Sequence, residues 1–241
     1  MSYDFSTVPN FTITECSSGS VDIVEYKDHF ALYNNGDIWM VFNKNTDKEI
    51  KELYSSYDLA YGDVLVSGLG FGILALWLCN KAEVKSVTVV EISQDVIELF
   101  KKNNLVPNNL NIINDNMITY CTEKKYDVLL LDHYEEQEFD FRIKDIEKIA
   151  NRITHNYIWA WSLEEIFMTK AYESRKSTNM LDFYNNIIND ESFFIDTWHD
   201  FINTYFPKTL SIKNAPTKNI RDYIDNYFNK DSYKQIDTPK L

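Results

Sequence analysis

The sequence predicts an α/β fold built on a mainly parallel, doubly wound sheet, and three observations support this. Between residues 63 and 161, near-continuous apolar segments alternate with segments of helical periodicity, a pattern typical of a parallel sheet covered by helices on both faces. The first apolar segment leads directly into a glycine-rich turn that opens a helix. An acidic residue, Glu91, ends the second apolar segment.

The N-terminal part, residues 1–45, is expected to form a small antiparallel β unit. Alternation predicts strands over residues 11–14, 21–26 and 30–33, and the apolar residues 38–42 are expected to form a fourth. The tetrapeptide Asn34-Asn35-Gly36-Asp37 predicts a tight hairpin between the last two, because Asn and Gly tolerate the positive φ angles of such turns.

Residues 46–165 are expected to form the main domain, which begins with a helix over residues 47–60. The predicted strands cover residues 63–67, 86–91, 110–114, 126–132 and 157–161, and the predicted helices residues 73–81, 94–103, 117–123 and 142–152. In such sheets ligands bind outside the carboxyl ends of the strands, where the strand order reverses. The loops after these strands are therefore where a functional site is expected.

Residues 166–241 are expected to form a helical C-terminal extension and tail. The segment 163–205 is mostly helical in pattern and rich in aromatic residues, and one further helix is expected near residues 220–228. The rest of the tail is polar and carries two prolines after residue 214, which favours irregular structure.

Composition narrows the classes of partner. The chain has 241 residues, and its 24 Lys and Arg against 37 Asp and Glu give a net charge of −13. Such a charge disfavours nucleic acid and anionic membrane surfaces and is compatible with a small, including a cationic, acceptor. The four histidines show no metal-ligand spacing, so no metal site is expected. The oligomeric state stays open, with a homodimer among the options.

A cytoplasmic location is the expectation from the cysteines and the N-terminus. The three cysteines are widely spaced and form no C-x-x-C pair, as expected in a reducing compartment. The first five residues, Met1-Ser2-Tyr3-Asp4-Phe5, lack the basic start and apolar core of a signal peptide.

The glycine turn Gly68-Leu69-Gly70-Phe71-Gly72 indicates which nucleotide to expect. The dinucleotide fingerprint G-x-G-x-x-G leaves room for a pyrophosphate, but here Ile73 occupies the position of its third glycine. A phosphate-binding P-loop requires a Gly-Lys dipeptide, and the chain contains none. Glu91, 21 residues after Gly70, is placed to accept hydrogen bonds from ribose hydroxyls. Together these features favour S-adenosylmethionine over NAD or ATP.

A family resemblance rests on four segments: residues 64–72, Glu91, residues 111–115, and the run Tyr126-Asp127-Val128-Leu129-Leu130-Leu131-Asp132. They resemble the Rossmann-like, class I S-adenosylmethionine-dependent methyltransferase fold, and within it the spermidine synthases most closely, over roughly residues 20–165.

The resemblance implies a set of cofactor-binding residues. The turn glycines Gly68, Gly70 and Gly72 would line the methionine and ribose end of S-adenosylmethionine, or of its decarboxylated form. Glu91 would hold the ribose hydroxyls, and Asp115 with Asn116 would meet the adenine amino edge. Leu69 and Ile92 are expected in the same site. An alternative for Asp115 is a purely structural role, in which Asn114 and Asp115 form an Asx turn and helix cap.

Two departures from the spermidine synthase pattern concern the reacting groups. Those enzymes carry an Asp between the second and third glycines, where this chain has Phe71. After the fourth strand they have D-S-S-D, whereas this chain has Asp132-His133-Tyr134-Glu135. The nucleoside part of the resemblance is therefore better matched than the part that holds the aminopropyl group and the amine acceptor.

Asp132, His133 and Tyr134 are the candidate catalytic residues. A carboxylate at the end of the fourth strand can orient or deprotonate an attacking amine, and His133 and Tyr134 are alternative bases or orienting groups. The structural alternative is that Asp132 caps the following segment and His133 is merely exposed. Likewise, the acidic run over residues 135–140 is either a gate for a cationic substrate or a solvated loop.

Three functions follow from these residues. The first is an S-adenosylmethionine-dependent methyltransferase acting on a small-molecule acceptor. The second is a spermidine synthase-like aminopropyltransferase that makes a polyamine from decarboxylated S-adenosylmethionine. The third is a catalytically degenerate protein that keeps the fold for binding, which the departures at Phe71 and after Asp132 leave open.

Overall fold

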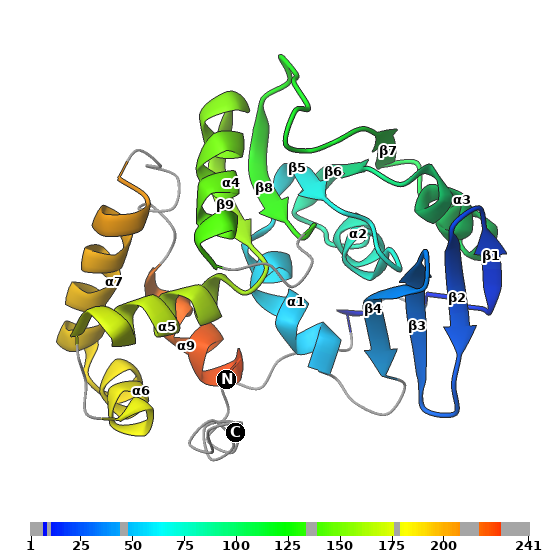
Figure 1. Ribbon diagram of the computed structural model, residues 1–241. Helices are drawn as coiled ribbons and strands as arrows, with labels where there is room; N and C mark the ends of the chain where they lie inside the picture. The colour runs from blue at the N-terminus through cyan, green and yellow to red at the C-terminus, as the bar shows by residue number, and fades with distance from the viewer. Residues whose placement is uncertain are drawn as a thin grey trace. The chain divides into compact units, whose positions relative to one another are not determined.

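A computed structural model of the chain describes residues 7–8, 11–43, 48–133, 139–175, 179–207 and 217–227. The chain divides into two compact units, Ser2–Trp161 and Ser162–Leu241. The first holds two sheets and their covering helices, and the second is helical in its described parts (Figure 1).

The larger sheet of the first unit is entirely parallel. Its strands are β5 (Gly62–Ser67), β6 (Val84–Glu91), β7 (Leu110–Asn114), β8 (Tyr126–Leu131) and β9 (His155–Ala160). They lie in the order β7-β6-β5-β8-β9, so the chain moves outward from β5 to β7 and then returns to the other side of β5. This is the doubly wound order, with its reversal point between β5 and β8. The predicted fold class is confirmed.

Helices cover both faces of this sheet. They are α1 (Lys48–Leu59), α2 (Ile73–Cys79), α3 (Gln94–Asn103) and α4 (Phe139–Arg152). Because crossover connections between parallel strands are right-handed, α2 and α3 lie on one face and α4 on the other. The α1 helix packs beside α2, where the rings of Tyr57 and Trp77 stack at 4.0 Å. The enclosed strand residues, such as Val64 and Leu129, are fully buried.

The N-terminal sheet is antiparallel, as predicted, and its strands follow the chain order. They are β1 (Cys16–Ser18), β2 (Val21–Glu25), β3 (His29–Asn34) and β4 (Asp37–Asn43). Asn35 and Gly36, with φ of 51° and 87°, make the tight turn between β3 and β4, so the predicted hairpin is confirmed. In Figure 1 this sheet is the dark blue group beside α3.

The predicted strand over residues 11–14 is wrong. The backbone N–H groups of Thr12 and Thr14 donate instead to the side-chain oxygens of Asn104 and Asn103, at 3.1 and 3.0 Å. Asparagine amides at the end of α3 thus replace a neighbouring strand as hydrogen-bond partners.

The predicted helix over residues 117–123 is also wrong, and the segment is a turn. The Arg152 guanidinium donates to three of its carbonyls, those of Met117, Ile118 and Tyr120. In a helix these carbonyls would accept backbone N–H groups of later residues. Here they accept hydrogen bonds from a side chain of α4 instead.

The second unit contains α5 (Leu163–Arg175), α6 (Met180–Asn189), α7 (Glu191–Tyr205) and α9 (Thr217–Tyr227), in line with the helical extension expected from the sequence. The side chains of Asn179 and Asp190 cap α6 and α7 by accepting backbone N–H bonds. Its core is aromatic, with the Phe167 ring in edge contact with Phe194 and Trp198. Of the helices described, none has the length and apolar character needed to cross a membrane.

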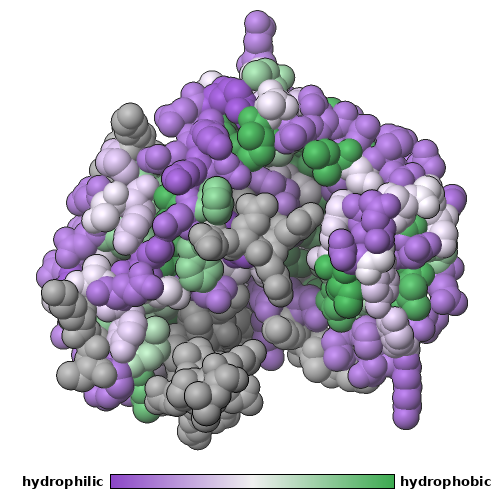
Figure 2. Space-filling model, in the orientation of Figure 1, coloured by the Kyte–Doolittle hydropathy of each residue, from purple (hydrophilic) through white to green (hydrophobic). Residues whose placement is uncertain are grey.

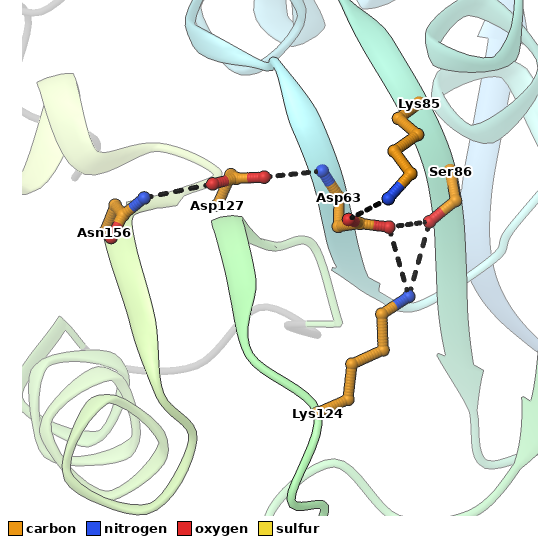
Figure 3. A network of polar contacts seen from close by, with 6 residues as sticks. All are labelled: Asp63, Lys85, Ser86, Lys124, Asp127 and Asn156. Atoms are coloured by element: carbon orange, nitrogen blue, oxygen red, sulfur yellow. Dashed lines mark hydrogen bonds and ion pairs between the residues drawn. The ribbon is translucent and has the colours of Figure 1, made fainter.

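A polar network holds together the amino ends of the strands (Figure 3). Asp63 of β5 accepts bonds from Ser86 and Lys85 of β6 and pairs with Lys124. The Ser86 hydrogen bond is the main reason that the pKa of Asp63 lies below its usual range. Asp127 of β8 bonds the Asp63 backbone N–H at 2.8 Å. Each of these groups has a partner in the network, which we therefore interpret as structural.

The surface in Figure 2 is mostly hydrophilic, with apolar residues in small separate groups. This agrees with the net charge of −13. Large apolar side chains that are more than half exposed include Ile38, Ile92 and Leu105.

Candidate functional site

The glycine turn lies at the carboxyl edge of the sheet, at the reversal point of the strand order. The Gly68 N–H donates to the carbonyl of Val90 on β6 at 2.9 Å. On the other side, the Asp132 N–H donates to the carbonyl of Ser67 at 2.9 Å. The turn is therefore fixed between the ends of β6 and β8, where a ligand is expected in this topology.

Two of the turn glycines are required by neighbouring protein atoms. Gly68 has φ of +88°, and a Cβ there would lie 2.1 Å from the carbonyl oxygen of Asp132. Gly72 has φ of +79°, and a Cβ there would lie 2.2 Å from the Phe100 ring of α3. Gly72 is also the N-cap residue of α2, where no side chain caps the first turn. The backbone N–H groups at the start of α2 thus have no side-chain cap.

The middle of the turn faces the N-terminal sheet. A Cβ on Gly70 would lie 2.8 Å from the sulfur of Met40 on β4. Phe71 is 4% exposed and lines a small cavity with Ile23, Leu32 and other apolar residues of this sheet and α3. At the position where spermidine synthases carry an Asp, this chain therefore places a side chain in its apolar interior.

Glu91 is bonded directly to the glycine turn. Its two carboxylate oxygens accept the backbone N–H groups of Leu69 and Ser93, each at 2.8 Å. The residue is 6% exposed, and this burial raises the pKa of its carboxyl, although the backbone hydrogen bonds oppose the shift. A carboxylate has about four lone-pair sites, so these two bonds leave acceptor capacity for ribose hydroxyls.

The predicted adenine-contacting residues lie at the adjacent strand ends. The Asp115 N–H donates to the Glu91 carbonyl at 3.1 Å, which ties the loop after β7 to the end of β6. Asp115 and Asn116 are both exposed. Asn116 also accepts the Ile118 N–H at 2.9 Å, so it has a structural role within the turn while its side chain stays exposed. Ile92 presents a side chain that is 62% exposed.

Asp132 follows β8 directly and points to the face of the sheet that α1 covers. The Trp159 indole donates to Ser55 of α1 at 3.1 Å, which shows that Trp159 faces α1. Leu130 is in register with Trp159, and Asp132 lies two residues further on, hence on the same face. Burial, and secondarily the carboxylate of Glu52, raise the pKa of Asp132 from 3.8 to about 7.

Glu52 is a site residue that the sequence pattern did not reveal. Glu52 lies in the first half of α1, and its carboxylate is close enough to Asp132 to affect the pKa of that residue. Two carboxyl groups, from Glu52 and Asp132, thus come from positions 80 residues apart along the chain.

His133 points to the opposite face, toward α4. Its Nδ1 is hydrogen-bonded to the hydroxyl of Ser67 at the end of β5. Burial lowers the pKa of His133 to about 4, despite an opposing effect of Asp145 on α4. The third candidate, Tyr134, and the acidic residues 135–138 lie outside the described residues, and Asp140 is exposed on α4.

The structure therefore brings most of the predicted residues to one edge and adds three that were missed. Ser67, Glu52 and Met40 were missed because their roles depend on pairing between distant segments. A serine directly before the glycine turn was the one available signal. Within the described residues, no three potential metal ligands lie together.

Comparison with known proteins gives matches only at the level of structure. No family model and no curated protein matches the sequence. Spermidine synthase from Thermotoga maritima is similar, with 16% identity and a TM-score of 0.45, over 60% of this chain and 54% of that one. A spermidine synthase in complex with the transition-state analogue AdoDATO has 16% identity and a TM-score of 0.44, over 60% and 53%.

A methyltransferase is also among the similar structures. The S-adenosylmethionine-dependent methyltransferase from Clostridium acetobutylicum has 16% identity and a TM-score of 0.32, over 46% of this chain and 48% of that one. The chain spans about half the length of each of these three structures. Because identity is low, the fold assignment rests on the strand order, the glycine turn at its reversal point and the acidic end of β6. By these features the first unit has a Rossmann-like, doubly wound parallel fold.

Proposed function

We propose that the chain is an S-adenosylmethionine-dependent transferase that moves a methyl group to a small-molecule acceptor. The observation that carries the proposal is the position of the glycine turn, between the acidic end of β6 and Asp132 at the end of β8. In doubly wound sheets this position binds nucleotides, and Asp132 places a proton acceptor beside it.

The residues around the turn fit an adenosine-bearing sulfur compound. Ile92 offers an exposed apolar side chain for a base, and Asp115 and Asn116 offer polar groups at its edge. Glu91, whose carboxylate accepts the Leu69 N–H, would accept hydrogen bonds from the ribose hydroxyls. The missing glycine or alanine at Ile73, which is 1% exposed, argues against a pyrophosphate-containing ligand.

Methyl transfer requires that the acceptor atom be aligned with the methyl carbon and that one group accept a proton. Bound S-adenosylmethionine would supply an electrophilic methyl carbon on a sulfonium. The acceptor's nucleophilic atom must approach that carbon in line, which is a matter of positioning. As an amine nitrogen gains the methyl group it loses a proton, and Asp132 would take it. A pKa of about 7 suits an acid–base group that works near neutral pH.

The acceptor class follows from the charges at this edge. Asp132 and Glu52 put two acidic groups at this edge of a chain with a net charge of −13, and we propose a small cationic amine rather than a nucleic acid or a membrane lipid as the partner. Such an acceptor also fits aminopropyl transfer from decarboxylated S-adenosylmethionine, the second candidate. Phe71 argues against this second candidate. It is a buried phenylalanine at the position where spermidine synthases carry an Asp, so the carboxylate is absent here.

An activity assay separates the two reactions. Purified protein is incubated with either S-adenosylmethionine or its decarboxylated form and a panel of small amines, and products are measured by mass spectrometry. A mass gain of one methyl group, only with the carboxylated donor and lost in Asp132→Asn, supports the proposal. Aminopropylated product, formed only with the decarboxylated donor, would replace it with the second candidate.

A binding assay addresses the third candidate, a degenerate relative without catalysis. A ligand present at a hundred times its dissociation constant stabilises the folded state by about 2.7 kcal/mol. Stabilisation by S-adenosylhomocysteine without turnover on any acceptor would favour this candidate. Failure of S-adenosylmethionine, its decarboxylated form and methylthioadenosine to stabilise the protein would reject nucleoside binding altogether.

A further inference from the structure

Ser67 and His133 form a buried polar pair at the edge of the proposed site. Ser67 ends β5 immediately before the glycine turn and is fully buried. Its hydroxyl is hydrogen-bonded to Nδ1 of His133, which follows Asp132. The Asp132 N–H, bonded to the Ser67 carbonyl at 2.9 Å, holds the two segments in register.

The direction of this hydrogen bond follows from the burial of Ser67. Within the described parts of the chain, Nδ1 of His133 is the one hydrogen-bond partner of this hydroxyl. If Nδ1 carried a proton and donated it, the hydroxyl hydrogen would be buried without an acceptor, which costs about 1–3 kcal/mol. The hydroxyl therefore donates and Nδ1 accepts. A neutral imidazole that accepts at Nδ1 carries its proton on Nε2.

We propose that Ser67 is a positioning residue that holds His133 as a neutral imidazole with its proton on Nε2. In this state Nδ1 of His133 is occupied by the Ser67 hydroxyl and its buried Nε2 carries a proton, so the ring is not a base. The charged groups around the ring agree with a neutral form, since burial outweighs the attraction of Asp145 on α4.

The consequence for the site is a division of roles between neighbouring residues. Asp132 faces α1 and Glu52, and is the proton acceptor, whereas His133 faces α4 and is held as a neutral ring that takes no proton. The predicted alternative of His133 as the base is replaced by this role. The catalytic part of this inference rests on the proposed function, but the tautomer of His133 is a property of the ligand-free protein.

The test is ¹⁵N-NMR of the histidine side chains in the ligand-free full chain. The His133→Gln variant assigns the His133 signals among those of the four histidines. We expect Nδ1 without and Nε2 with a directly bonded proton, and no titration of His133 between pH 5.5 and 8, where an ordinary histidine titrates near 6.5.

Variants separate positioning from general stability. Ser67→Ala removes the donor to the neutral ring, so we expect a higher pKa of His133 and a mixture of tautomers. Ser67→Thr keeps the hydroxyl and should restore the Nε2–H form even if it lowers stability. Ser55→Ala, which removes another buried hydroxyl, bonded to Trp159, should leave the His133 signals unchanged.

The outcomes distinguish this inference from the proposed function. A proton on Nδ1 of His133 in the wild-type protein, or identical His133 spectra in the wild type and Ser67→Ala, would overturn the inference whatever ligand binds. Binding of S-adenosylhomocysteine, measured on the same samples by calorimetry, tests the proposed function separately, because it does not depend on the tautomer.

Discussion

Replacement of Gly68 by alanine tests how tightly the glycine turn is fitted to Asp132. Gly68 and Gly36 have nearly the same φ, +88° and +87°, so an added side chain strains both backbones alike, by about 1–2 kcal/mol. They differ in surroundings. A Cβ on Gly36 meets nothing within 4 Å, whereas one on Gly68 would lie 2.1 Å from the Asp132 carbonyl oxygen. Gly36→Ala is therefore a matched control.

The expected magnitude follows from what must move. The carbonyl of Asp132 would have to shift by about 1 Å or more to reach normal contact, and its N–H bond to Ser67 would be lost or weakened, at about 1 kcal/mol. With an overpacking cost of about 1–3 kcal/mol, Gly68→Ala should lower the free energy of unfolding by roughly 3–5 kcal/mol in total. Gly36→Ala should lower it by about 1–2 kcal/mol.

Urea unfolding, followed by tryptophan fluorescence, measures both variants; four of the five tryptophans lie in the unit Ser2–Trp161 that contains Gly36 and Gly68. The melting temperature should fall by about 2–4 °C per kcal/mol for a chain of this size. Equal losses in the two variants would refute the close approach of Gly68 to Asp132, and with it the fitted edge of the proposed site.

Three further substitutions test other parts of the structure. Because the folded-state pKa of Asp132 is raised from 3.8 to about 7, the folded state binds its proton more tightly. The free energy of unfolding should then fall from pH 4 to 7 by at most about 4 kcal/mol. Urea unfolding of Asp132→Asn over the same pH range should lack this fall. The same dependence of unfolding free energy on pH in the wild type and the variant would contradict the burial of Asp132. Lys81→Met removes the ammonium bonds to the carbonyls of Tyr57 and Asp58, at 2.7 and 2.8 Å. It should cost about 1–3 kcal/mol in chemical unfolding, and a neutral effect would show that water replaces them. Trp198→Phe removes an indole N–H that is buried and unpartnered among the described residues. The loss of this unpaired donor should largely offset the cost of the smaller ring. A loss of more than about 3 kcal/mol in thermal unfolding would contradict this.

Much of the parallel sheet could be predicted because its signals are local. Apolar runs such as Val64–Val66 and Val128–Leu131 are buried on both faces, so their composition alone indicates central strands. The Asn35-Gly36 turn was equally local, since the residues with positive φ are those that tolerate it. The position of Gly68 after a buried strand then predicts where the candidate site lies.

The errors lie where side chains from distant segments replace local hydrogen bonds. The segment after Asn116 has helical composition, yet Arg152, more than thirty residues later, binds its carbonyls. Residues 11–14 alternate like a strand, yet Asn103 and Asn104 supply their partners. No local pattern contains these partners.

The same distinction applies to the candidate site. The residues on strand ends, such as Glu91 and Asp132, were found because a strand and its following loop are contiguous. Glu52 was missed because its approach to Asp132 depends on how α1 lies against the sheet. The role of Phe71 was also not apparent, because only the packing of the N-terminal sheet shows that it is buried.

The central claim is that the glycine turn and the ends of β6 and β7 bind an adenosine-bearing sulfur compound. Titration of ¹⁵N-labelled protein with S-adenosylhomocysteine, followed by amide NMR, tests it residue by residue. The largest shifts should fall on the turn Gly68–Gly72, on Ile92 and on Asn116, with little change in the hairpin at Gly36. Amide positions at the turn that stay fixed at saturating ligand, or shifts confined to residues 162–241, would contradict it.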